Sequence, residues 1–129
     1  MNPTRAAMRG RQLANRMMVD HCTITRPGRP AVDPLTGRET QIGISVYLGP
    51  CRITSELHDE HLEEAGGASF NVERLALQLP HGSAVLRGNE QVEITRSLNP
   101  ALTGRKFRII ARATKSLAII DKYTIEELA

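Results

Sequence analysis

One acidic stretch of the chain has side chains that could bind a metal ion. It holds two histidines three positions apart among carboxylates: His58, Asp59, Glu60, His61, Glu63 and Glu64. Such a set could bind a metal ion if the stretch were helical. It differs from the H-E-x-x-H pattern, because the histidine spacing is different and no carboxylate is placed to act as a base. We therefore favour a solvated acidic loop, and we predict no metal site and no cofactor.

Residues for nucleophilic catalysis are present but scattered. None of the six serines lies in a G-x-S-x-G turn, and the pair Gly66-Gly67 is not followed by the G-K-[ST] of a phosphate loop. Because no nucleophile, base and orienting group can be placed together, we predict that the protein is not an enzyme and has no catalytic residues.

The two cysteines, Cys22 and Cys51, lie in separate strand-like segments beside apolar neighbours. Neither has the C-x-x-C spacing of a redox or zinc site. A disulfide between them is possible in principle, but nothing indicates secretion, so two buried thiols are the favoured interpretation.

Two rows of basic residues could lie along a phosphate backbone. One is on a predicted helix (Arg5, Arg9, Arg16) and the other on a predicted strand (Lys106, Arg108, Arg112). Aromatic residues make up only 3% of the chain, which argues against a barrel that stacks single-stranded bases. Solvated faces are the alternative interpretation of both rows.

From its length, we predict that the chain folds as one domain, residues 1–129, and that its helix and strands position the residues named above. With 40% apolar residues and no Trp, the core must be built from Leu, Ile and Val. No apolar run approaches the length of a membrane span, and residues 1–20 carry four arginines without the apolar core of a secretory signal. We expect a domain made inside the cell and no membrane partner.

Hydrophobic periodicity predicts a mainly β fold. Residues 3–19 follow a helical period behind the N-cap and first-turn pair Asn2-Pro3, with Ala6, Gly10, Leu13 and Met17 on one stripe. The period then changes to two over a first β part, 21–54, interrupted by a loop or long hairpin at 27–42, and over the remaining strands in 71–128. Between them we predict a mobile acidic loop, 55–70. The pattern indicates a small antiparallel β-barrel or sandwich of about six strands with an N-terminal α-helix and long loops.

Charge is distributed unevenly along the chain. Residues 1–38 hold seven arginines against two aspartates, whereas residues 39–70 hold six acids against Arg52. A chain polarised in this way can form head-to-tail contacts between copies of itself. The predicted helix also lacks acids near its N-terminus and contains Gly10, so it must be ordered by something on which it docks.

The order of the motifs carries a family resemblance. An Arg-rich helix is followed by HCTITRPG at 21–28, DPLTG at 33–37, VYLGPCRI at 46–53, EAGG at 64–67, LP at 79–80 and NPALTGRKFRI at 99–109. Over residues 14–128 this order resembles the head-closure, or head-to-tail stopper, proteins of long-tailed double-stranded-DNA phages, particularly those of actinobacteriophages.

The resemblance implies a structural protein of the virion neck, assembled in the host cytoplasm. Such proteins form a ring of six or twelve subunits, below the portal and adaptor and above the tail terminator or tail tube. The ring retains packaged double-stranded DNA and docks the tail. We expect the helix, with Arg5, Arg9 and Arg16, to dock on a neighbour, and the acidic segment 55–69 to project into the channel or onto a partner.

Two other interpretations stay open at this point. The chain could be another ring component of the neck or tail, such as an adaptor or a tail terminator. It could instead be a small β-barrel module that binds nucleic acid, which would bind DNA with a steep dependence on salt.

Overall fold

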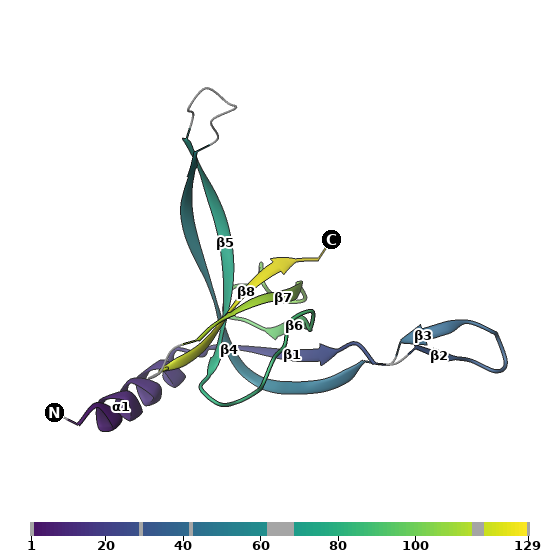
Figure 1. Ribbon diagram of the computed structural model, residues 1–129, viewed down its shortest axis with the longest axis horizontal. Helices are drawn as coiled ribbons and strands as arrows, with labels where there is room; N and C mark the ends of the chain where they lie inside the picture. Colours follow the sequence, from purple (N-terminus) through teal and green to yellow (C-terminus); the bar gives the residue numbers. More distant parts are fainter. Residues whose placement is uncertain (1, 29, 42, 62–68, 115–117, 129) are drawn as a thin grey trace.

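Six antiparallel strands close into a barrel, from which one helix and two hairpins project (Figure 1). This computed structural model describes residues 2–28, 30–41, 43–61, 69–114 and 118–128. The elements are α1 (Pro3–Arg16), β1 (Asp20–Arg26), β2 (Pro30–Val32), β3 (Glu39–Gln41), β4 (Ile44–His61), β5 (Ser69–Pro80), β6 (Gln91–Arg96), β7 (Lys106–Ala113) and β8 (Ile120–Glu127). The prediction of a mainly β barrel with an N-terminal helix is confirmed.

The barrel has the strand order β1-β4-β5-β8-β7-β6, and β6 pairs back with β1 to close it. Alternate residues of each strand point inward, as the period of two predicts. The core consists mainly of aliphatic side chains with two thiols and two aromatic rings, namely Cys22, Ile24, Cys51, Leu77, Leu79, Leu86, Val92, Ile94, Phe107, Ile109, Tyr123 and Ile125. A closed barrel leaves no unpaired edge among its own strands.

Helix α1 begins as predicted, with the Asn2 side chain accepting a hydrogen bond from Thr4 N at 3.0 Å. It ends at Arg16 rather than at residue 19, because the chain must turn there for Met18 to enter the buried interior. The face that touches the barrel is centred on Ala7. The predicted apolar stripe is therefore only partly covered: Leu13 and Met17 are more than half exposed.

The connection at residues 27–42 is a hairpin, one of the two forms predicted for it. Strands β2 and β3 pair from Pro30 with Gln41 to Val32 with Glu39, and they form a two-stranded sheet separate from the barrel. This hairpin projects from the end of the molecule opposite α1 along the longest axis (Figure 1).

The predicted acidic loop, 55–70, is wrong over residues 55–61 and 69–70, which belong to strands β4 and β5. These strands pair continuously from Arg52 with Gln78 to His61 with Ser69 and form a long ribbon that rises from the barrel (Figure 1). Antiparallel pairing satisfies the backbone groups that face the partner strand, and it does not require apolar alternation in the sequence. Residues 62–68 lie outside the described residues.

Candidate functional site

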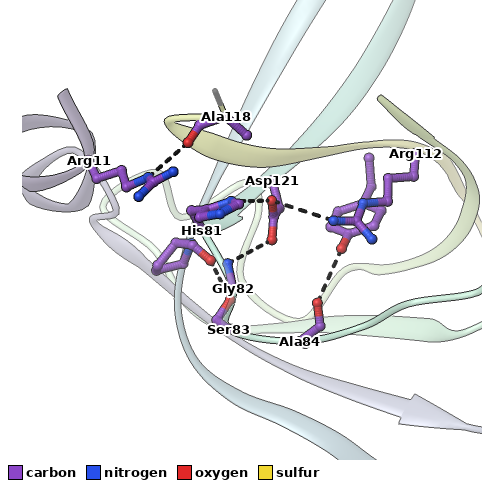
Figure 2. Close-up of polar contacts among 10 residues, drawn as sticks. Arg11, His81, Gly82, Ser83, Ala84, Arg112, Ala118 and Asp121 are labelled. Atoms are coloured by element: carbon purple, nitrogen blue, oxygen red, sulfur yellow. Dashed lines mark hydrogen bonds and ion pairs between the residues drawn. The ribbon is translucent and has the colours of Figure 1, made fainter. Parts of the chain in front are cut away.

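The most densely connected polar group of the barrel centres on Asp121, which is buried on β8. Its Oδ1 lies 3.0 Å from His81 Nδ1 and 3.8 Å from Arg112 Nη2, and its Oδ2 accepts a hydrogen bond from Gly82 N at 3.0 Å (Figure 2). Asp121 thus joins the turn that follows β5 to the end of β7. A buried carboxylate needs such partners, because an unpaired charge in a barrel interior is costly.

Arg112 and Tyr123 complete this cluster. The guanidinium carbon lies 5.9 Å from the centroid of the Tyr123 ring, within the range of a cation–π contact. The Tyr123 hydroxyl donates to Ala84 O at 3.5 Å (Figure 2), and burial raises the pKa of this phenol. The ring and the ion pair together connect β7 with β8 at this place.

An aspartate beside a histidine can orient the imidazole as a base. The nearest hydroxyl in sequence is Ser83, whose Oγ donates to Pro80 O at 2.6 Å (Figure 2), so its proton is held by the backbone rather than by His81. What the arrangement does is to fix the turn after β5 against β8. The sequence indicates that Asp121 points inward, since Asp121 occupies an inward position of the alternation that continues at Tyr123 and Ile125.

Two further carboxylates are buried near the barrel ends. Glu90 is fully buried: its Oε2 accepts from Arg87 N at 2.8 Å and lies 3.9 Å from Arg26 Nη2, while its Oε1 has no hydrogen-bond partner among the described residues. Asp20 accepts from Ser97 Oγ at 2.8 Å. Both contacts tie loops to strand ends, a structural use of buried charge.

Cys22 and Cys51 are free and fully buried on neighbouring strands β1 and β4. The register places Cys22 opposite Gly49 and Cys51 opposite Asp20, so the two cysteines are diagonal neighbours. A hydrogen bond with Cys22, together with burial, raises the pKa of the Cys51 thiol. The favoured interpretation of two buried thiols is confirmed in this structure.

The predicted acidic site is only partly described. His58, Asp59, Glu60 and His61 are consecutive residues of β4, and Glu63 and Glu64 lie outside the described residues. The metal hypothesis required a helix, whereas the backbone here is extended, and a separation of three does not return to the same face of a strand. Among the residues that the structure describes, no group of three or more His, Cys, Asp or Glu is placed to hold a metal ion.

The two basic rows have different outcomes. Arg5, Arg9 and Arg16 are all exposed on α1, away from the barrel. On β7 two of the three members, Lys106, Arg108 and Arg112, have partners: Arg108 forms an ion pair with Glu126, and Arg112 contacts Asp121 and Tyr123. The β7 row is therefore not a free row of phosphate contacts.

Within the described ranges, no helix is long and apolar enough to cross a bilayer.

The fold and these contacts define a class: a small closed antiparallel β-barrel with a projecting helix and two projecting hairpins. The chain belongs to a family of unknown function, DUF6093, which matches residues 10–126. No curated protein and no solved structure matches the chain.

Proposed function

We propose that this protein is a head-to-tail stopper of a long-tailed double-stranded-DNA phage, a structural subunit of a ring in the virion neck. The ring retains the packaged DNA and presents the surface on which the tail docks. The proposal starts from the order of sequence motifs, which resembles that of head-closure proteins. The closed barrel with a dependent helix is compatible with it.

The observation that carries the proposal is the β4–β5 ribbon. Strand β4 pairs with β1 only up to Cys51, and β5 pairs with β8 only from Leu75 onward. The six register pairs from Glu56 with Arg74 to His61 with Ser69 therefore have no third strand among the described residues, over a length of about 20 Å. An isolated two-stranded ribbon is marginally stable in water, so a ribbon of this length is suited to packing against another subunit.

Exposed apolar residues on the other projections support the same conclusion. Leu13 on α1, Met17 directly after the helix, and Val32 and Leu35 on the β2–β3 hairpin are all at least half exposed. Large apolar side chains gathered on projecting elements mark protein–protein contacts rather than a site for a small substrate. An assembly of many copies covers these surfaces.

Charge adds a role for the ribbon in the neck. Residues 55–64 contain five acids and no lysine or arginine. A segment of this composition repels phosphate, so it can lie beside packaged DNA without holding it. The proposed neighbours are the portal and adaptor above and the tail terminator or tail tube below.

Electron microscopy of phage particles tests the proposal. An antibody or small tag on the chain should label the neck, and particles made without the protein should lose DNA and remain without tails. Absence from assembled particles, or turnover of a small substrate by the pure protein, would overturn it. Salt-titrated DNA binding separates the nucleic-acid alternative, because a binding module shows appreciable affinity that falls steeply with salt.

A further inference from the structure

We propose that the tip of the β2–β3 hairpin of one copy docks through Leu35 onto the pocket formed by Arg5, Ala6, Arg9 and Leu13 on helix α1 of a second copy. This inference deepens the proposed function, and rests on it, by assigning the surfaces through which ring subunits join.

The tip of the β2–β3 hairpin exposes the apolar side chain of Leu35 to solvent. Asp33 Oδ1 accepts a hydrogen bond from Leu35 N at 2.9 Å, and Asp33 O accepts one from Gly37 N at 2.8 Å. Gly37 adopts a φ of 68°, which glycine tolerates, so the turn closes without strain. Leu35 at its apex is 94% exposed. These hydrogen bonds hold the backbone of the turn in the conformation that presents Leu35, which lowers the entropic cost of docking.

The pocket on α1 is the complementary feature. It has a volume of about 500 Å³ and is lined by Asn2, Arg5, Ala6, Arg9, Gly10 and Leu13. Ala6 and Leu13 supply apolar surface, and Leu13 is 62% exposed. An incoming leucine side chain at this site would exclude water from both partners.

The charges around the two surfaces are also complementary. Helix α1 contains four arginines and no acid, and two of these arginines, Arg5 and Arg9, border the pocket. Residues 30–41 of the hairpin contain Asp33 and Glu39 against one cation, Arg38. Hydrogen bonds from Leu35 N and the Thr36 side chain lower the pKa of Asp33, so its carboxylate stays ionised.

The positions of the two surfaces determine the kind of contact. Helix α1 and the β2–β3 hairpin lie at opposite ends of the longest axis (Figure 1), so one copy cannot dock onto itself. A knob at one end and a pocket at the other make a head-to-tail interface, which closes into a ring when the rotation between copies permits. The second copy is therefore the occupant that the geometry favours.

The test compares oligomer size by sedimentation velocity at concentrations up to several hundred micromolar. Leu35→Asp removes the knob, and Arg5→Glu with Arg9→Glu reverses the charge of the pocket. Leu98→Asp is the matched control, because Leu98 is also largely exposed but lies in the turn after β6. We expect each interface variant to weaken association at least about tenfold and the control to behave as wild type.

Mixing the two interface variants gives a sharper result. Each variant retains one intact surface, so a mixture should form one-to-one complexes that cannot grow further. All variants should melt like the wild type, since the changed residues are exposed. Assembly that is unaffected by Leu35→Asp, assembly that depends on the β4–β5 ribbon alone, or a wild-type protein that stays monomeric would each overturn the inference. Labelling of the phage neck is independent of these outcomes, so the two proposals fail separately.

Discussion

His81 Nδ1 lies 3.0 Å from Asp121 Oδ1, and this contact joins the turn after β5 to the buried side of β8. The same carboxylate accepts a hydrogen bond from Gly82 N and forms an ion pair with Arg112. One acid thus connects three segments of the barrel end.

Removing this carboxylate should destabilise the barrel. We expect Asp121→Ala to lower the free energy of unfolding by about 3 kcal/mol, because Gly82 N and the partners on both sides lose a buried acceptor. Urea denaturation measures the change. The control is Glu126→Gln, which breaks the exposed pair with Arg108 and should cost less than about 1 kcal/mol. Equal stability of Asp121→Ala and the wild type would contradict the structural role assigned to the cluster.

Stability should fall at alkaline pH. The pKa of the Cys51 thiol is raised in the folded state by the hydrogen bond with Cys22 and by burial, and burial first, then the nearby cysteines, raises the pKa of Tyr47 to about 12. Both groups hold their protons more tightly when folded, so their contribution is intact below the unfolded values of about 8.5 and about 10. It is lost as the pH rises above them.

Thermal melting between pH 7 and 11 measures this loss. A Cys51→Ala variant should show a smaller decline than the wild type above about pH 8.5, because it lacks one of the two groups. An unchanged slope would show that Cys51 does not contribute.

The thiols themselves should resist modification. Cys22 and Cys51 are fully buried, so a thiol reagent should label neither in the folded protein and both after denaturation. We expect the mass of the air-exposed protein to correspond to two thiols, since both cysteines are free and buried away from oxidants in solution. Rapid labelling at neutral pH, or a mass two hydrogens lower, would be the contrary result.

Deleting residues 58–67 should leave the barrel folded. Within the part of the chain that the structure describes, the affected stretch of the β4–β5 ribbon pairs with no third strand, whereas the pairs from Arg52 to Ser55 remain supported by the barrel end. Circular dichroism should show cooperative unfolding of the variant, and phage particles carrying it should lose DNA or fail to join tails. Normal infectious particles would exclude a role for the ribbon in the neck.

Melting of the wild-type protein should be insensitive to chelators. His58 and His61 lie on an extended strand, where their spacing does not reproduce the one-faced pair of a helix. Elemental analysis should find no bound metal, and a melting temperature that falls in the presence of EDTA would revive the metal hypothesis.

The parts of the fold that were predictable are those with one buried face. In β1 and β6 every second residue is apolar and buried, as at Cys22, Ile24, Val92 and Ile94, so the period of two is visible in the sequence. The ribbon was not predictable from this signal. Beyond the barrel, β4 reads Glu56-Leu57-His58-Asp59-Glu60-His61, which has no apolar alternation, and its pairing with β5 does not depend on such a pattern.

The candidate site residues also divide into those that a local sequence pattern indicates and those that it does not. The helical period indicated that Arg5, Arg9 and Arg16 share an exposed face of α1, whereas their role in docking stays a prediction. The partners of Asp121 come from 40 and 9 positions away, at His81 and Arg112, and no local pattern indicates such pairing. Leu35 was placed within a turn, but its near-complete exposure follows only from the hairpin geometry.

The place of β8 in the sheet order has a consequence for biosynthesis. Strand β8, Ile120–Glu127, lies between β5 and β7 in the barrel. The barrel therefore cannot close until β8 has been translated. Pairing of distant segments is slow compared with local folding. The nascent polypeptide therefore acquires its closed barrel only after β8 has left the ribosome, and copies meet one another with their barrels already closed.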